Sequence, residues 1–231
     1  MEKIADTHLL DFYCNKFDLY SLFSKNIKDH MELFLFNRNE LICNHALKLE
    51  YVFLFVEGKA KIYNTLSNGK SLLLCFYKPF KILGDLEIFI NNAIPFNVQA
   101  LETCYCIGIH INYVNEYLLQ DPKTLKFFCS ALSEKLYKLS VNSSINLLYQ
   151  VENRLASYIL ATGEKISIDS IDTLIFRENL TYLSELIGTS YRHLLRTINN
   201  FCNNNIMKKH KDFYEIIDIK ALNKLTKDLY N

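Results

Sequence analysis

Two arginines, Arg192 and Arg196, carry the clearest chemical signal in this sequence. A guanidinium group donates a rigid fork of hydrogen bonds that matches the acceptor edge of guanine and the oxygens of phosphate. Because an α-helix repeats about every 3.6 residues, a helix would present both arginines on one face. Polar side chains recur on that face, at Tyr191, Asn199, Asn200 and Asn203. This pattern predicts a surface that hydrogen-bonds to nucleic acid.

Further positive charge follows this face in the sequence. Residues 177–211 contain six Lys or Arg but only two Glu, a balance of +4 in a chain whose formal net charge is +1. Phosphate backbones attract such concentrated charge whatever the base sequence. The lysines are therefore predicted to contact phosphate, and the arginines to reach bases or phosphate.

The segment 180–201 has the pattern of a helix-turn-helix that would position the two arginines. Gly188 provides the backbone angles that a tight turn needs, and Ser190 can cap the second helix by accepting a hydrogen bond from its first turn. The inward positions at helical spacing are Leu183, Leu186 and Ile187, then Leu194, Ile198 and Phe201. Taken alone, the same pattern would also fit two amphipathic helices of any small domain.

A two-stranded wing is predicted after this motif. The turn-prone run 203–205 is followed by two apolar residues, a basic tip and an alternating strand over 213–217. A helix over 151–162, stopped by Gly163, and a hairpin of 166–168 with 173–176 lead into the motif. The predicted DNA contacts are Ser190, Tyr191, Arg192, Arg196, Asn199, Lys208, Lys209 and Lys211.

Short apolar or alternating segments dominate the first half of the chain. They predict strands over 31–36, 41–43, 51–56, 60–66, 71–77, 96–101 and 103–109. Asn68-Gly69 is a strong hairpin signal between two of them. Seven short strands with turns between them indicate a jelly roll or barrel, so the predicted fold class is α+β. Helices are expected over 9–23 and 111–119, on either side of this roll.

The longest predicted helix begins at Asp121, as its cap, and Pro122, and ends near Tyr149. Apolar residues recur along it at alternating intervals of four and three residues, which is the spacing of a coiled-coil seam. They are Leu125, Cys129, Leu132, Leu136 and Leu139. A second copy of the chain is the simplest partner for this seam, which predicts a homodimer. The expected domains are a sensor roll over 1–121, a dimerisation helix over 122–149 and a DNA-binding domain over 150–231.

Composition sets outer limits on these expectations. Half of the 231 residues are hydrophobic, which is enough for a substantial core, but no apolar run reaches the length of a membrane span. The seven cysteines show no pairing rhythm, which favours a reducing compartment over a disulfide framework. A soluble protein of the cytoplasm is expected.

The order of parts resembles the Crp/Fnr superfamily of bacterial transcription regulators. The stretches that carry the resemblance are FVEGKAKIYNTLSNGKSLLL and ILGDLEIF with NVQAL in the roll, and IGTSYRHLLRTINNF in the helix-turn-helix. The resemblance implies a homodimer that binds a palindromic operator and contacts RNA polymerase, with no enzymatic activity. It also implies that Arg196 reads guanine, whereas Arg192 stands where the family usually has Glu, which would change the half-site.

The predicted effector site departs from the cAMP-binding members of this family. Gly84 and Asp85 match a Gly-Glu pair that holds the ribose, but Pro95 and Phe96 replace the Arg-Ser pair that holds the phosphate. Only Ser140 is retained of a Thr-Ser pair on the long helix. Because no Lys or Arg occurs between residues 81 and 123, a buried phosphate would have no cation from this part of the roll. An effector other than a cyclic nucleotide, or none, is expected; a cyclic-nucleotide-responsive regulator is the alternative.

The cysteines offer a second kind of sensor. The Fnr branch holds an iron–sulfur cluster through closely spaced N-terminal cysteines, and this chain has only Cys14 there. Cys104 and Cys106 would face the same side of a strand, with Cys75 on another strand. We interpret these three as small buried hydrophobes, with a redox or metal role as the alternative. His45 and His110 are interpreted as lone structural residues, so no cofactor or metal is expected.

Two other classes of protein compete with this interpretation. A jelly roll can house a cupin-like metal enzyme, but cupins use a His-x-His pair with further ligands, which this sequence lacks. Neither a Ser-His-Asp set nor a phosphate-binding glycine loop is recognisable. A dimeric module that uses its winged helix for protein contacts stays open on sequence grounds.

Overall fold

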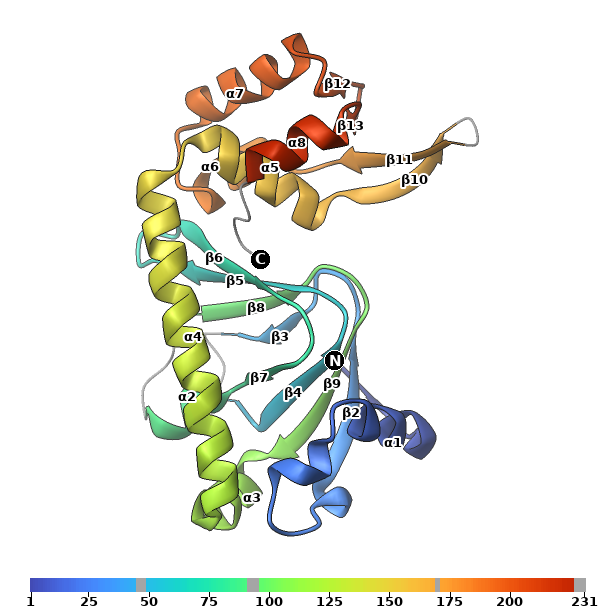
Figure 1. Cartoon of the computed structure of the whole chain (residues 1–231), viewed down its shortest axis with the longest axis vertical. Coiled ribbons are helices and arrows are strands. Elements are labelled where there is room, and N and C mark those ends of the chain that lie inside the picture. Colours follow the sequence, from blue (N-terminus) through green and yellow to red (C-terminus); the bar gives the residue numbers. More distant parts are fainter. Residues whose placement is uncertain (45–48, 91–95, 169–170, 227–231) are drawn as a thin grey trace. The chain divides into compact units, whose positions relative to one another are not determined.

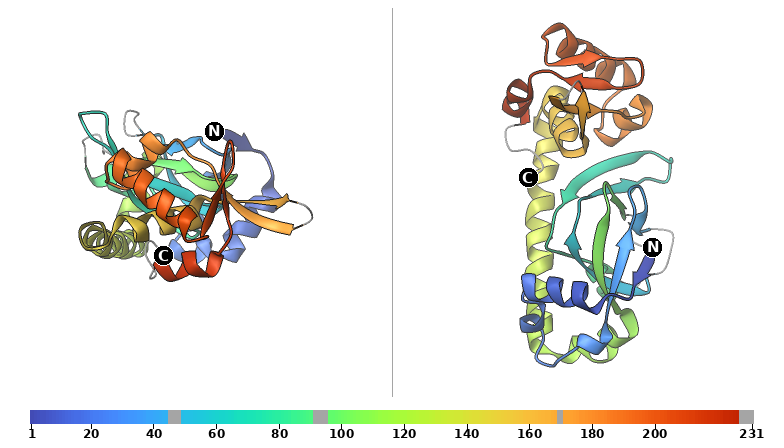
Figure 2. Two further views of the ribbon diagram at one scale, coloured as in Figure 1. Left: turned by 90° about the horizontal axis from the view of Figure 1, so that it is seen from above. Right: turned by 90° about the vertical axis from the view of Figure 1, so that its right-hand side faces the viewer.

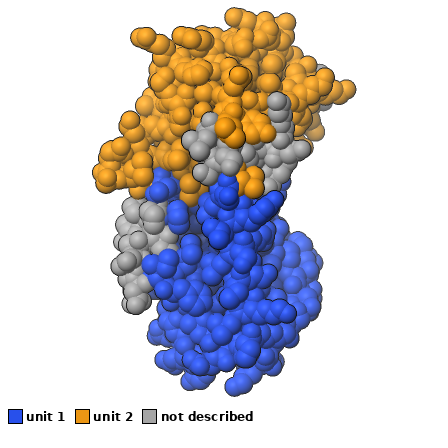
Figure 3. Space-filling view, turned by 60° about the vertical axis from the view of Figure 1, so that its left-hand side comes forward, with its two compact units in different colours: residues 1–64, 75–140 blue, residues 65–74, 141–231 orange. Residues whose placement is uncertain are grey.

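The computed structural model describes residues 1–44, 49–90, 96–168 and 171–226. They form two compact units (Figure 3): unit 1 comprises residues 1–64 and 75–140, and unit 2 comprises residues 65–74 and 141–231. The helix α4, Pro122–Leu148, crosses the boundary between them. Among the described helices, none combines the length and the apolar character that crossing a bilayer requires.

Two antiparallel sheets form a β-roll (Figures 1 and 2), which confirms the predicted α+β fold with a jelly roll. The first sheet has the order β1-β2-β9-β4-β7 and the second has the order β3-β8-β5-β6. The strands of the first sheet are β1 Glu2–Ile4, β2 Met31–Phe36, β4 Tyr51–Glu57, β7 Lys81–Leu83 and β9 Cys104–His110; those of the second are β3 Leu41–Cys43, β5 Ala60–Thr65, β6 Ser71–Tyr77 and β8 Phe96–Ala100.

The core of the roll follows from its central strands. β4 lies between β9 and β7, and its residues from Val52 to Val56 are all buried, so it is apolar along its length rather than alternating. Aromatic rings from β2 and β4, the two strands that flank β9, pack edge to face, with ring centroids 5.5 Å apart for Phe34 and Phe53 and 5.6 Å apart for Phe36 and Phe53. Leu10 and Tyr13 of the N-terminal helix are buried in a cluster with Leu33 and Leu54, which alternate with these phenylalanines along β2 and β4 and so lie on the opposite face of the sheet.

Short helices flank the roll. They are α1 Thr7–Lys16, α2 Asp85–Phe89 and α3 Ile111–Glu116, with 3₁₀ turns at Leu19–Leu22, Lys28–His30 and Leu118–Gln120. The N-terminal helix is shorter than the predicted range 9–23. The reason is local: Asp18 adopts a left-handed conformation with φ of 49°, which an α-helix cannot continue through.

The helix α4 begins where the sequence predicts. The Asp121 carboxylate accepts hydrogen bonds from the Lys123 amide (3.2 Å) and the Thr124 hydroxyl (2.7 Å), which satisfies the first turn. These bonds, and two more from Ser24, lower the pKa of this carboxyl group; the Ser24 bonds are the largest cause. One face of α4 is fixed to the roll, because Thr124 and Phe128 are almost fully buried.

Unit 2 is a winged helix. Its elements are α5 Val151–Thr162, β10 Glu164–Ile168, β11 Ile171–Phe176, α6 Leu180–Leu186, α7 Tyr191–Asn203, β12 Met207–Lys209, β13 Tyr214–Ile216 and α8 Ile219–Thr226. The strands form one sheet of order β10-β11-β13-β12. Tyr158 and Phe176 meet edge to face in its core, with centroids 6.2 Å apart. The last helix, α8, has no counterpart in the sequence predictions; it contacts α5, where the Asn153 amide donates to the Leu225 carbonyl (2.7 Å).

Candidate nucleic-acid interface

The helix-turn-helix is built by local hydrogen bonds. The Asn179 side chain caps α6 by accepting from the Thr181 and Tyr182 amides, at 2.9 and 3.1 Å. Gly188 lies in the turn with φ of +63°, a left-handed conformation that favours glycine. Ser190 Oγ then accepts from the His193 amide at 3.2 Å and caps α7. The direction of α7 is therefore fixed by its own cap and by the turn before it.

The helix α7 has two sharply different faces. Leu194, Ile198 and Phe201 are at most 2% exposed and hold the helix against the core of unit 2. The other face is polar and exposed. It carries the predicted DNA contacts Tyr191, Arg192, Arg196 and Asn199, together with Asn200 and Asn203. Within the described residues, neither Arg192 nor Arg196 forms an ion pair or a side-chain hydrogen bond. Both guanidinium groups are available to a partner.

A hollow of about 530 Å³ runs beside this face. It is lined by Glu152, Arg192, His193, Leu195, Arg196, Thr197, Asn199, Asn200 and Asn203. Glu152 belongs to α5 and brings a negative charge next to the two arginines. Sequence reasoning missed it, because Glu152 is remote from α7 in the chain and only the packing of α5 against α7 brings it here.

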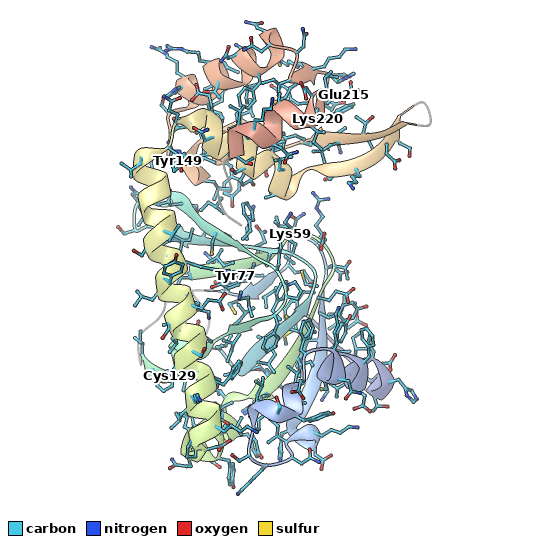
Figure 4. The ribbon with its side chains drawn as sticks, in the orientation of Figure 1. Lys59, Tyr77, Cys129, Tyr149, Glu215 and Lys220 are labelled. Carbon is cyan, nitrogen blue, oxygen red and sulfur yellow. The ribbon has the colours of Figure 1, made fainter. Side chains whose placement is uncertain are left out.

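The wing is a short hairpin whose turn is held by several contacts. The His210 amide donates to the Phe213 carbonyl at 2.9 Å, and the two rings stack with centroids 4.6 Å apart. His210 Nε2 lies 2.7 Å from the carboxylate of Glu215, which is labelled in Figure 4. The Arg177 guanidinium lies 6.0 Å from the Phe213 ring, a cation–π distance. The predicted phosphate contacts Lys208, Lys209 and Lys211 are all exposed on this hairpin.

The predicted seam of α4 carries large apolar side chains that the single chain leaves uncovered. Leu136 is 71% exposed and Leu139 is 36% exposed, and Cys129, labelled in Figure 4, is also exposed. Leu125 and Leu132 are half-buried. An apolar face of this extent is typical of an association surface.

The predicted effector residues occupy several elements of the roll. Gly84, with φ of +89°, and the buried Asp85 form the N-terminus of α2, whereas Phe96 is half-buried on β8, where it pairs with Asn64. Ser140 is exposed on α4, and Pro95 lies outside the described residues. The expectation that this site has no cation is incomplete, because Lys135 of α4 reaches Asp85, with 2.5 Å between Nζ and Oδ1. Sequence reasoning could not see this pair, since its members belong to separate elements.

The cysteines of the roll are held as thiols. Burial raises the pKa of Cys104 to about 11 and of Cys75 to about 12, and it raises the pKa of Cys106 well above its ordinary value. Cys104 and Cys106 share β9, whereas Cys75 belongs to the other sheet. In the part of the chain that is described, no three His, Cys, Asp or Glu side chains are grouped to hold a metal ion. His110 caps α3 through Nδ1, 3.2 Å from the Asn112 amide, and His45 lies outside the described residues.

Comparison with known proteins agrees with this architecture. Residues 33–121 match the family model of the cyclic nucleotide-binding domain. The regulatory protein YeiL of Escherichia coli O157:H7 is 29% identical over 207 residues, which cover 90% of this chain and 91% of YeiL. A candidate Crp/Fnr transcriptional regulator from Eubacterium rectale superposes with a TM-score of 0.73 at 14% identity, covering 87% of this chain and 92% of that one.

The chain has the fold of the Crp/Fnr regulators. A Crp/Fnr-family transcriptional regulator from Thermus thermophilus superposes with a TM-score of 0.64 at 14% identity, over 86% of this chain and all of that one. The c-di-GMP-responsive global regulator CLP of Xanthomonas campestris gives 0.61 at 14% identity, over 82% and 95% of the two chains. The Crp/Fnr resemblance seen in the sequence is thus confirmed by similarity to YeiL over most of the chain and by structural similarity.

Proposed function

We propose that this chain regulates transcription by binding a palindromic operator as a homodimer. The observation that carries the proposal is the exposed face of α7, where Arg192 and Arg196 are unpaired within the described residues, beside a lysine-bearing wing. In a helix-turn-helix, side chains at the start of the second helix reach base edges in the major groove. The cationic wing fits the neighbouring phosphates.

The exposed seam of α4 supports the homodimer. Leu136 and Leu139 need an apolar partner surface, and the same seam on a second copy provides one. A two-fold dimer presents two α7 helices to DNA, which is the physical reason to expect an operator with inverted half-sites.

The chemistry of α7 bears on the half-site. Arg192 and Arg196 both donate, and both suit guanine, whereas a Glu in the place of Arg192 would accept from cytosine. We therefore propose a half-site that differs from the TGTGA and TTGAT types usual in the family. Asn199 is placed to read adenine or to contact phosphate.

The effector is proposed to be a molecule other than cyclic AMP or cyclic GMP, if one exists. The phosphate-holding Arg-Ser pair is absent, and Lys135, the cation nearest Asp85, is already engaged by that carboxylate. The structural neighbour CLP is named for responding to c-di-GMP, so a regulator of this fold can respond to a molecule other than cyclic AMP or cyclic GMP. For a bacterial transcription regulator, we also propose RNA polymerase as a partner and the cytoplasm as the location.

Selection from a library of random double-stranded DNA tests the proposal. Purified full-length protein should enrich an inverted repeat, and sedimentation of the complex should show two chains for each enriched duplex. Failure to bind any duplex above the level of random DNA would reject the proposal and favour a dimeric module that contacts proteins.

A further inference from the structure

Asp85 and Lys135 form a largely buried ion pair. The Asp85 side chain is 2% exposed and that of Lys135 is 13% exposed. Lys135 Nζ lies 2.5 Å from Asp85 Oδ1 and donates a second hydrogen bond to the Ile82 carbonyl at 2.8 Å. Both residues belong to unit 1, so the long helix α4 is bound to the roll at the first residue of α2.

The other oxygen of this carboxylate is unused. Asp85 Oδ2 is buried and has no hydrogen-bond partner among the residues that the structure describes. A buried carboxylate oxygen without a donor is unfavourable, so this atom is a ready acceptor for a donor that enters the site. An ammonium group has three donors and could satisfy both oxygens.

Among the described residues Lys135 pairs with Asp85, and the half-buried Glu87 lies near both: burial and the Asp85 charge raise the pKa of the Glu87 carboxyl group, whereas the Lys135 charge lowers it. Lys81 and Lys138 both pair with Glu134, at 2.7 and 3.3 Å. Lys135 Nζ also lies 6.0 Å from the ring of Tyr77, labelled in Figure 4. Burial raises the pKa of Tyr77, so this phenol stays neutral beside the pair. The site therefore combines one buried carboxylate, one aromatic face and one ammonium group supplied by the chain.

We propose that the Asp85 carboxylate binds a primary ammonium group, and that Lys135 serves it as a tethered ligand. A small molecule with a primary ammonium group would compete with Lys135 for Asp85 and release α4 from the roll at this point. Because α4 carries the proposed dimer seam and continues into unit 2, its release would alter DNA affinity. The effect on DNA affinity rests on the proposed function, whereas the binding of an ammonium group at Asp85 does not.

Chemical rescue tests the site directly. Lys135→Ala removes every side-chain atom beyond Cβ, and n-propylammonium supplies the same number of carbons with the same head group. The melting temperature of full-length Lys135→Ala should rise with n-propylammonium chloride but not with tetramethylammonium chloride at equal ionic strength. The double variant Asp85→Asn with Lys135→Ala should not respond. If Lys135→Ala folds only in the presence of the amine, the refolding yield replaces the melting temperature as the readout.

Equal responses to the two cations, or an equal response of the double variant, would overturn the site. The matched control is Lys138→Ala, which removes a lysine from the same helix but breaks only the exposed pair with Glu134; n-propylammonium should leave it unchanged. In a second arm, n-propylammonium should shift the operator affinity of the wild type, in which it displaces Lys135, by about fivefold or more, and leave that of Lys135→Ala, which has no tether to displace, unchanged. Rescue of folding with no shift in affinity would remove the link to DNA, while a wild type that binds no DNA would reject the proposed function and leave the site intact.

Discussion

The helices α4 and α7 expose opposite kinds of surface. Both bury one apolar face in their own unit: Thr124 and Phe128 on α4, and Leu194 and Ile198 on α7, are almost fully buried. The outward face of α4 is again apolar, with Leu136 71% exposed, whereas that of α7 carries arginines and asparagines. A helix that is apolar on two faces needs two apolar partners, and a helix with one cationic face needs an anionic one.

This difference indicates that α4 serves the proposed association of two chains and that α7 serves the proposed binding of DNA. Association through α4 is driven by removing apolar surface from water, so it should be insensitive to salt. Binding through α7 and the wing depends on phosphate charge, so it should weaken steeply as salt is raised. The comparison can therefore be tested by changing each surface separately.

The largest effect is expected from charging the α4 seam. Leu132→Asp with Leu136→Asp should give monomers, because four carboxylates would face each other across the proposed two-fold axis. Operator affinity should fall about 10²- to 10⁴-fold, since the two half-sites would no longer be bound by linked units. Sedimentation velocity and fluorescence anisotropy measure the two results.

The control for this change adds equal charge away from the seam. Ser130→Asp with Tyr137→Asp places two carboxylates on exposed positions of the same helix. This variant should remain a dimer with nearly unchanged operator affinity. An intact dimer of the Leu132 and Leu136 variant would show that the seam is misassigned.

The next effect is expected at Arg196. Arg196→Ala should reduce operator affinity by about 1–3 kcal/mol and relax preference at one base pair, while binding to random DNA changes much less. Lys224→Ala, which removes an exposed positive charge from α8, is the control and should change neither. Equal losses on operator and random DNA, with a shallower salt dependence, would make Arg196 a phosphate contact and leave base reading to Tyr191, Arg192 or Asn199.

Smaller and uniform effects are expected at the wing. Lys208→Ala and Lys209→Ala should weaken all DNA sequences alike, and removing each phosphate interaction should reduce the slope of log affinity against log salt by about one. Titrations at several salt concentrations, on operator and random DNA, measure this slope. A loss confined to the operator would mean that the wing reads sequence instead.

The regular parts of both units could be predicted from the sequence because their patterns are long enough to read. β2 Met31–Phe36, β6 Ser71–Tyr77 and α5 Val151–Thr162 match the predicted ranges residue for residue. β1 Glu2–Ile4 and β7 Lys81–Leu83 could not be predicted, since three residues show no period and both strands exist through pairing with β2 and β4. Glu152 and Lys135 were missed for the same kind of reason: each joins its site only when another helix or strand packs beside it.

The last prediction is that cyclic nucleotides have no effect on DNA binding. Cyclic AMP and cyclic GMP at millimolar concentration should leave operator affinity unchanged. A buried phosphodiester needs a cation, and the ammonium of Lys135 already pairs with Asp85, while Lys81 pairs with Glu134. A nucleotide that took Lys135 would leave the buried Asp85 carboxylate unpaired, and one that took Lys81 would leave Glu134 of α4 paired with Lys138 alone. Micromolar binding of a cyclic nucleotide in calorimetry would contradict this prediction. It would mean that Lys135 leaves Asp85 and pairs with the phosphate. The Asp85–Lys135 pair would then control the binding of an anion, and Asp85 would not be a site for an ammonium group.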